Sequence, residues 1–382
     1  MKSLELAHFE LPESTLALRQ EVRKFLKSEL EAGSFVPQCD SWNSGHSASF
    51  SQKLAMRGWL GMTWPRQYGG HERSALERFV VVEELLAAGA PVAAHWPTDR
   101  QVGPSILRYG SDEQRRRFLP AMARGECFFA VGMSEPDSGS DLASVRTRAD
   151  RSDGHWVVNG SKVWTTHAHH CHYIILLLRT STVGNDRHAG LSQMIIDLTA
   201  PGVTIRPILL ISGEHRFNEV IFEDAAVNDD MVLGEVGDGW RQVTGELSVE
   251  RSGPERYMSV MKLLLAFLNA AGLEGGERAQ VAAGELIAQM WTLREMSLAV
   301  AGALDRGEEP AVEAALVKDL GTRFDRELID VVRRALSVEP ALGSKDHLAS
   351  TLADAIMVAP GFTLRGGTTE ILRSVIVKGL EL

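Results

Sequence analysis

The spacing of apolar residues changes twice along this chain of 382 residues. From Leu16 to about Arg124 they recur at helical spacing with charged residues between them, which predicts amphipathic helices. Between Cys127 and Gly234 short β-branched and aromatic runs alternate with turn residues, which predicts strands. Helical spacing returns after Gly239 and continues to the end. The order of elements therefore predicts helices, then strands, then helices.

The chain is longer than the about 250–300 residues at which one hydrophobic core stops growing, so several domains are expected. We predict an α+β protein with an N-terminal helical domain (1–125), a middle β-barrel-like domain (126–235) and a C-terminal helical bundle (236–382). The order differs from the alternation of a doubly wound parallel sheet, and no G-x-G-x-x-G follows a strand and opens a helix. A Rossmann nicotinamide site is therefore disfavoured.

Local signals predict some boundaries within these domains. Ser111 and Gln114 form a capping-box pattern at the start of a helix that continues to Met122. Asn159 and Gly160, between two apolar runs, form a two-residue hairpin signal. The strand after that hairpin would carry Trp164.

Composition excludes several classes of protein. Hydrophobic residues make up 44% and charged residues 24% of the chain, as in an ordinary globular enzyme. The net charge is −10 and no basic run exceeds 115–117, so a nucleic-acid partner is not expected.

The chain also lacks the sequence marks of export and of membrane insertion. Its three cysteines, Cys39, Cys127 and Cys171, are widely separated, which argues against a disulfide framework. Residues 1–11 lack a signal pattern, and the most apolar runs are shorter than the ~18 residues that span a bilayer. We expect a cytoplasmic protein with no membrane segment.

Two segments could carry chemistry. The loop 132–142 concentrates hydroxyl groups, glycine and proline before the β domain, and such a loop offers backbone N–H groups to an anionic or heteroaromatic ligand. The run 162–166 places an indole and two hydroxyls at one strand end. Taken alone, the loop 132–142 could equally be a surface turn, and the run 162–166 could be part of a strand core.

Taken together, the motifs of this chain resemble those of the acyl-CoA dehydrogenase family over nearly its whole length. The segments that carry the resemblance are 64–70 (WPRQYGG), 133–136 (MSEP) with 139–141 (GSD), 159–166 (NGSKVWTT), 217–222 (FNEVIF) and 367–373 (GTTEILR). The resemblance implies the family's three-part fold. It also implies an FAD enzyme of lipid metabolism that oxidises the Cα–Cβ bond of an acyl-CoA thioester to the trans-2-enoyl-CoA.

The family pattern assigns a role to each matching residue. Four residues would contact the isoalloxazine, with Met133 and Ser134 at its pyrimidine edge, Trp164 against the ring and Thr166 near N5. The segment along the FAD pyrophosphate and adenosine would be Thr368, Thr369 and Glu370. The substrate would be bound by Ser140, Arg251 and Gly367.

The reaction needs a carboxylate that removes the α proton and an acceptor for hydride from the β carbon. In many family members that carboxylate precedes the Gly-Thr of the C-terminal motif, but here the position is Gly366. Another subgroup carries the base in a Glu-Arg pair on the first long helix of the C-terminal domain, and Glu250 matches it. We predict Glu250 as the base, with Glu246 as second choice because it shares the same helical face. Glu370 is a poorer candidate.

Two features of the family are absent from the sequence. An Arg-x-x-Phe-Gly and a Gln-x-x-Gly-Gly-x-Gly segment, which in the family reach the FAD of a neighbouring subunit, have no counterpart in the C-terminal third. The expected assembly is therefore either a homo-oligomer (dimer or tetramer) or a heterotetramer with a homologous subunit. The expected electron acceptor is an electron-transfer flavoprotein.

The sequence leaves other functions and other residue roles open. The chain could be a flavin-dependent monooxygenase or oxidase on the same fold, or a non-catalytic partner subunit of a heteromeric acyl-CoA dehydrogenase. The histidine-rich run 167–172 could bind a metal, but neighbours on an extended chain point to opposite faces, so at most two imidazoles converge and no metal site is predicted. Arg365 could face a polar acyl tail or the solvent.

Overall fold

The computed structural model describes residues 6–181, 184, 186–273 and 275–381, and the side chains of residues 246–250 and 273 lie outside this description. The chain divides into two compact units. Unit 1 comprises residues 1–45, 73–92 and 248–382, whereas unit 2 comprises residues 46–72 and 93–247. Both ends of the chain thus contribute to one unit and the middle forms the other.

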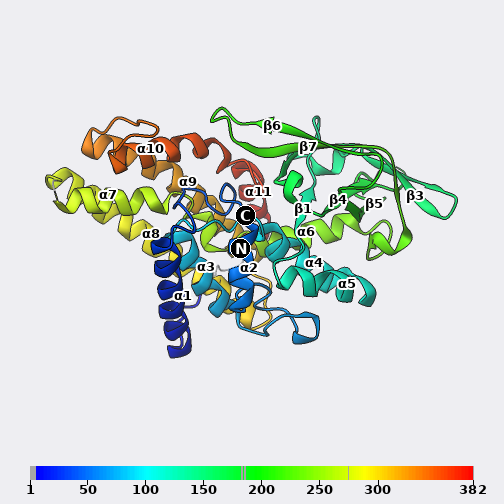
Figure 1. Ribbon diagram of the computed structural model, residues 1–382, viewed down its shortest axis with the longest axis horizontal. Coiled ribbons are helices and arrows are strands. Elements are labelled where there is room, and N and C mark those ends of the chain that lie inside the picture. The colour runs from blue at the N-terminus through cyan, green and yellow to red at the C-terminus, as the bar shows by residue number, and fades with distance from the viewer. Residues whose placement is uncertain (1–5, 182–183, 185, 274, 382) are drawn as a thin grey trace. The chain divides into compact units, whose positions relative to one another are not determined.

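Unit 1 is helical (Figure 1). Its helices are α1 (Glu13–Glu31), α3 (Ala75–Ala87), α7 (Met261–Leu273), α8 (Glu277–Asp305), α9 (Ala311–Leu336), α10 (His347–Val358) and α11 (Thr369–Leu380). α3 packs against α1 and α8, while α9 packs against α8 and α11. Their buried residues recur at helical spacing, as Val22, Phe25 and Leu26 do in α1.

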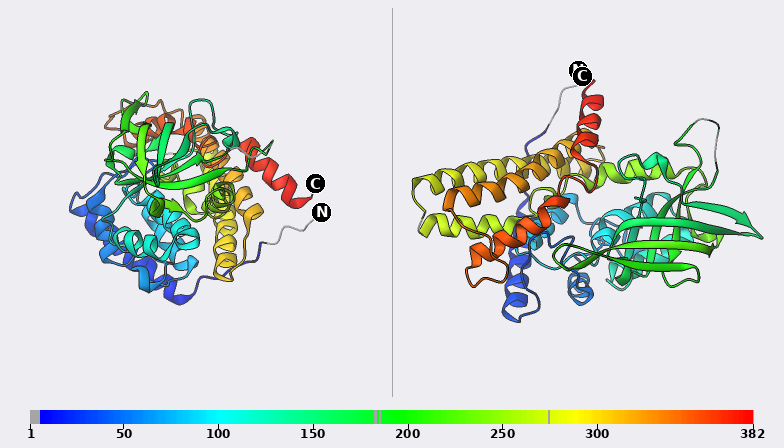
Figure 2. Two further views of the ribbon diagram at one scale, coloured as in Figure 1. Left: turned by 90° about the vertical axis from the view of Figure 1, so that its right-hand side faces the viewer. Right: turned by 90° about the horizontal axis from the view of Figure 1, so that it is seen from above.

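Unit 2 contains the strands, which form one mixed sheet in the described residues (Figures 1 and 2). The strands are β1 (Phe129–Gly132), β2 (Arg148–Ser152), β3 (His155–Thr166), β4 (Tyr173–Arg179), β5 (Leu191–Asp197), β6 (Val203–Leu209), β7 (His215–Val227) and β8 (Val232–Leu233). Their order is β6-β7-β3-β2-β4-β5-β8, and β1 pairs in parallel with β4. β4 is buried along its centre, which agrees with its unbroken run of isoleucine and leucine.

Short helices precede and follow the sheet within unit 2. They are α2 (Ala48–Met56), η1 (Arg66–Tyr68), η2 (Thr98–Val102), α4 (Gly103–Tyr109), α5 (Asp112–Ala123) and α6 (Gly239–Glu250), whose last three residues belong to unit 1. Side chains of α4 and α5 join those of β1, β4 and β5 in one apolar core. At the start of α5, Ser111 and Gln114 form the predicted capping box, which confirms that boundary.

The predicted hairpin at Asn159 and Gly160 is wrong. β3 runs through both residues without a turn, because it pairs with β2 on one side and with β7 on the other. The irregularity at Gly160 is a register shift against β7, and a Cβ there would lie 2.6 Å from the Thr147 hydroxyl. The β2–β3 turn lies instead at Asp153 and Gly154, both with positive φ, as a tight hairpin requires. The prediction that Trp164 lies on a strand is confirmed.

Candidate functional site

The first group of predicted cofactor residues lies in unit 2, where the loop after β1 meets the end of β3. The Met133 carbonyl accepts a hydrogen bond of 3.0 Å from the Lys162 ammonium. The Ser134 carbonyl accepts one of 2.9 Å from the Val163 N–H. These bonds hold Met133 and Ser134 beside the strand segment that carries Trp164, so the structure brings these predicted residues together.

Trp164 departs from regular strand geometry. It lies in a register shift between β3 and β7, and its φ is +59°, which is unusual for an aromatic residue and is typical of functional segments. Its side chain is 57% exposed, and Phe217 meets the indole edge to face with ring centroids 5.8 Å apart. The bulge thus presents a flat aromatic surface that a planar ring could stack against.

The remaining predicted residues of unit 2 differ in burial. Thr166, the last residue of β3, is half-buried. Thr165 is buried, and its hydroxyl has no hydrogen-bond partner among the described residues. Ser140 is exposed on the loop, in a turn that the Ser138 hydroxyl closes by donating to the Asp141 carbonyl over 2.7 Å. Thr166 and Ser140 are therefore accessible, as ligand contacts must be.

Two residues that the sequence analysis did not assign to the site hold it together. Lys162 is fully buried and Glu135 is nearly so, and their side chains form an ion pair of 2.8 Å. Burial lowers the pKa of Lys162 to about 8, although the Glu135 carboxylate acts to raise it. Burial acts to raise the pKa of Glu135, but Lys162 and backbone N–H donors outweigh it, so that pKa lies below its ordinary value. Both groups are thus charged at neutral pH.

Next to this segment, imidazole rings stack in unit 2. The rings of His169 and His215 have centroids 3.7 Å apart, and those of His46 and His170 have centroids 4.3 Å apart. Burial, followed by neighbouring imidazoles, lowers the pKa of His46 and of His169 to about 4. The His46 and His169 rings are therefore neutral at pH 7. The described part of the chain holds no group of three or more His, Cys, Asp or Glu placed to bind a metal ion.

The second group of predicted residues lies in unit 1, around the Gly366–Gly367 turn. Both glycines have positive φ, +66° and +96°, which side chains rarely adopt. The Lys318 ammonium donates to the Gly367 carbonyl over 2.6 Å. A Cβ at Gly367 would lie 3.5 Å from an Arg251 guanidinium nitrogen, and one at Gly366 would lie 3.3 Å from a nitrogen of Arg256. Buried cations thus line Gly366, the position at which many family members carry a carboxylate.

The turn leads into α11, which begins at the predicted pyrophosphate segment. Thr368 is the N-cap residue, and its hydroxyl accepts a hydrogen bond of 3.4 Å from the Ile371 N–H. Thr369 is half-buried, and Glu370 is exposed in the first turn. Hydrogen bonds from the Glu370 backbone and from Thr368 lower the pKa of Glu370. Glu370 is therefore an ionised carboxylate at a helix N-terminus, where its charge is favourable.

The predicted base belongs to unit 1, within a few residues of the sequence boundary with unit 2. Glu250 is the last residue of α6, and its side chain, like that of Glu246, lies outside the described residues. Arg251 follows it and is 7% exposed. The role of Glu250 therefore stays a prediction.

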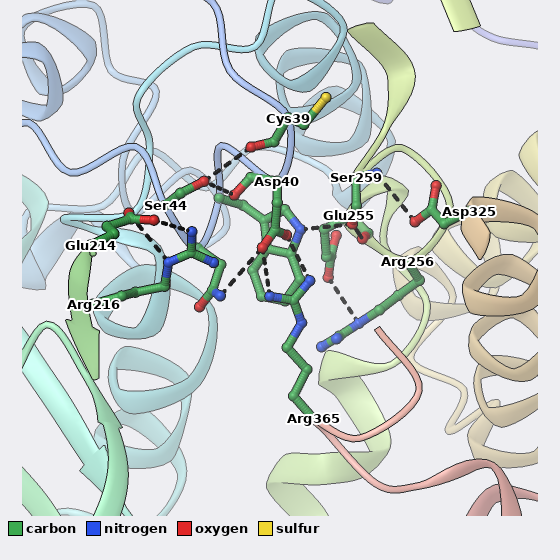
Figure 3. Close-up of polar contacts among 12 residues, drawn as sticks. Cys39, Asp40, Ser44, Glu214, Arg216, Glu255, Arg256, Ser259, Asp325 and Arg365 are labelled. Carbon is green, nitrogen blue, oxygen red and sulfur yellow. Dashed lines mark hydrogen bonds and ion pairs between the residues drawn. The ribbon is translucent and has the colours of Figure 1, made fainter. Parts of the chain in front are cut away.

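Arg365 does not face open solvent, so that prediction is wrong: its side chain is 21% exposed. That it faces a polar acyl tail stays a prediction. The Arg365 guanidinium donates to both carboxylate oxygens of Asp40, over 2.6 and 2.8 Å (Figure 3). The guanidinium carbon also lies 4.3 Å from the centroid of the Trp42 ring. The partner is hundreds of positions away in sequence, so no local signal could identify it.

The unit 2 residues fit a flavin. An exposed indole, a hydroxyl at Ser134 and a loop fixed by buried charges offer the aromatic and polar contacts that a planar heteroaromatic ring requires. The helical and β regions together with these unit 2 residues are typical of an enzyme class that binds a flat organic cofactor.

Comparison with known proteins agrees with this class. Family models match the acyl-CoA dehydrogenase N-terminal domain over residues 12–126, the middle domain over 130–225 and the C-terminal domain over 237–381. The chain is 34% identical to acyl-CoA dehydrogenase IpdE1 of Mycobacterium tuberculosis over 378 residues, 94% of this chain and 95% of that protein. It is also 34% identical to acyl-CoA dehydrogenase FadE29 of the same organism, over 87% of each chain.

Solved structures give the same result. The structure titled Tcur3481-Tcur3483 steroid ACAD matches with a TM-score of 0.85 and 27% identity over 99% of each chain. The ChsE4-ChsE5 complex from Mycobacterium tuberculosis matches with a TM-score of 0.84 and 28% identity, covering 98% of this chain and 99% of that one.

The chain belongs to the acyl-CoA dehydrogenase family, whose members are flavoprotein oxidoreductases of lipid metabolism. The predicted family, fold class and enzyme class are thereby confirmed. No helix in the described ranges has both the length and the apolar character needed to cross a membrane.

Proposed function

We propose that the protein is an FAD-dependent acyl-CoA dehydrogenase in which Glu250 removes the α proton of the thioester. Met133, Ser134, Trp164 and Thr166 would hold the isoalloxazine, and Thr368, Thr369 and Glu370 would lie along the pyrophosphate and adenosine. Bound FAD would supply the acceptor for the hydride that leaves the β carbon. Ser140, Arg251 and Gly367 would contact the substrate.

The observation that carries the choice of base is the chemistry of the Gly366–Gly367 turn. Glycine offers no proton acceptor there, and Arg251, Arg256 and Lys318 line the turn with positive charge. A carboxylate base must therefore come from elsewhere, and Glu250 is adjacent in sequence to Arg251. A carboxylate base must be ionised before it accepts the α proton, and cations close to it would favour that form.

A substitution at Glu250 tests the proposal. Glu250→Gln should keep FAD and acyl-CoA binding but lose anaerobic flavin bleaching by substrate, because the amide cannot accept the proton. Glu246→Gln is the matched control on the same helix and should bleach normally. Bleaching by Glu250→Gln at the wild-type rate contradicts the assignment, and its loss in Glu246→Gln alone would move the base there.

For the substrate, we propose an acyl-CoA with a polycyclic acyl group. The support is the similarity to a structure whose title names a steroid ACAD. Turnover with a steroid-derived acyl-CoA should exceed that with straight-chain acyl-CoA thioesters when an artificial electron acceptor is supplied. Preference for a straight-chain substrate across the panel would overturn this substrate class.

For the assembly, we propose that a homologous subunit completes the FAD sites. The support is the absence of the two segments that reach a neighbour's FAD, together with the similarity to a complex of ChsE4 and ChsE5. The chain expressed alone should purify with less than one FAD per subunit. One FAD per subunit in the purified single chain would favour a homo-oligomer. An electron-transfer flavoprotein is the proposed acceptor for the electrons.

A further inference from the structure

The ion pair between Glu135 and Lys162 closes the loop 133–147 onto β3. One Glu135 oxygen accepts hydrogen bonds from the Lys162 ammonium at 2.8 Å and the Thr147 N–H at 2.9 Å, and the other accepts from the Arg146 N–H at 2.7 Å. Lys162 also donates to the Met133 carbonyl at 3.0 Å. Two buried side chains thus fix the beginning of the loop, its end and the strand beside it.

We infer that Glu135 and Lys162 are positioning residues for the flavin, an inference that rests on the proposed FAD binding. They fix the position of the segment Met133–Ser134 relative to the bulge at Trp164. Neither side chain needs to touch the cofactor, since both are buried beneath these segments.

The hydrogen-bond pattern explains how this positioning works. The carbonyl oxygens of Met133 and Ser134 both accept hydrogen bonds from β3, from Lys162 and Val163 respectively. Both carbonyls are thus bound to β3. The Ser134 hydroxyl has no partner among the described residues and is available to a ligand. Val163, whose N–H donates to the Ser134 carbonyl, lies within the register shift that carries the exposed Trp164 indole.

An ion pair is not the most stable choice for these two buried side chains. A buried ion pair costs desolvation that apolar residues of similar size would avoid. The pair does supply a donor for the Met133 carbonyl and acceptors for two N–H groups, which apolar residues cannot do. A positioning role therefore predicts that ligand affinity and stability respond differently when the pair is replaced.

The test compares Lys162→Met with the double variant Glu135→Gln, Lys162→Met. The single variant leaves a buried carboxylate without its cation, so it should lower both the melting temperature and FAD affinity. The double variant removes both charges and should recover much of the melting temperature. Its dissociation constant for FAD, measured on apoprotein by flavin fluorescence, should stay raised about tenfold because Met133 has lost its donor. FAD affinity that recovers together with stability would overturn the inference.

Val158→Ala is the matched control, because Val158 is fully buried on the same strand and its truncation lowers stability by a cavity instead. At a temperature well below its melting temperature, Val158→Ala should bind FAD with the wild-type dissociation constant. An equal loss of FAD affinity in Val158→Ala would show that stability alone sets binding and would contradict the inference.

Amide hydrogen exchange at Val163 in the apoprotein separates this inference from the proposed function. Exchange should accelerate in both Lys162 variants and stay unchanged in Val158→Ala. A wild-type chain that takes up no FAD overturns the proposed function, and with it the flavin role of the pair. Unchanged exchange at Val163 in the Lys162 variants overturns the claim that the pair fixes this segment.

Discussion

The guanidinium of Arg365 binds both oxygens of the Asp40 carboxylate, at 2.6 and 2.8 Å (Figure 3). The Asp40 side chain is fully buried, and the Arg365 side chain is 21% exposed. The rings of Trp42 and Phe362 lie 4.3 and 5.5 Å from the guanidinium carbon. This bidentate pair fastens the segment after α1 to the segment that enters the Gly366–Gly367 turn, so it is a structural contact of unit 1.

Removing the cation should therefore destabilise unit 1. Arg365→Met leaves the buried Asp40 carboxylate without the cation that balances its charge, which costs about 3–5 kcal/mol. Denaturant unfolding would measure this loss, and the double variant Asp40→Asn, Arg365→Met should recover part of it. The exposed pair of Arg66 and Glu72 is the control, since Arg66→Met should change stability by less than about 1 kcal/mol. An Arg365→Met variant as stable as wild type would contradict a structural role.

The left-handed turn at Gly366 should tolerate no side chain. Gly366→Ala combines a φ of +66° with a Cβ only 3.3 Å from Arg256 and Lys318, so stability should fall by about 2 kcal/mol. Gly343→Ala is the matched control, because its φ is +67° but, apart from its chain neighbours, no described residue comes within 4 Å of the added Cβ. It should lose about 1 kcal/mol, from backbone strain alone. Equal losses in the two variants would show that the cations do not confine the turn.

A buried histidine should make unit 2 sensitive to acid. Burial lowers the pKa of His95 from 6.5 to about 4, partly offset by Asp99, and its ring is hydrogen-bonded to Ser51 at 2.8 Å. Because the unfolded chain binds the proton more tightly, this contribution is full above pH 6.5 and is lost as the pH falls towards 4. It amounts to about 3 kcal/mol.

His95→Gln tests this contribution by unfolding between pH 7 and pH 4. The loss of stability across that range should be smaller than in wild type, because one titrating group is gone. Val158→Ala, a change at a buried residue of the same unit that removes no titrating group, should keep the wild-type pH dependence. An identical pH dependence in wild type and His95→Gln would refute the assignment.

The features that the sequence could predict are those set by local chemistry. The capping box at Ser111 and Gln114 formed as predicted because its partners are three residues apart. The hairpin at Asn159 and Gly160 did not form, because pairing of β3 with both neighbours overrides the local turn preference.

In the candidate site, too, local motifs identify residues but not their burial. The motifs identified Met133, Ser134 and Trp164, but the burial of Lys162 and the exposure of Trp164 depend on a register shift between β3 and β7. That shift is decided by two strands about 50 positions apart, and no pattern within one strand encodes it. The pairing of Arg365 with Asp40 could not be predicted either, because the two residues are 325 positions apart in the sequence.

A buried carboxylate in α9 should give unit 1 the opposite pH response to that of unit 2. Burial raises the pKa of Asp325 from 3.8 to about 7, despite hydrogen bonds from Ser259, and its Oδ1 has no hydrogen-bond partner among the described residues. The folded state thus binds the proton more tightly than the unfolded chain does. Stability from this group is full below pH 3.8 and is lost as the pH rises to about 7.

Asp325→Asn removes the charge and retains an oxygen that can accept from the Ser259 N–H, which now donates to Asp325 over 3.3 Å. Above pH 7 the variant should be more stable than wild type by on the order of 2–4 kcal/mol, and the difference should vanish as the pH approaches 4. Hydrogen exchange of α9 amides at several pH values would measure it. Val332→Ala, at a fully buried residue of the same helix that does not titrate, should change stability by the same amount at every pH. If Asp325→Asn is the less stable protein at pH 8, the carboxylate is ionised and paired there, and the assignment of a raised pKa fails.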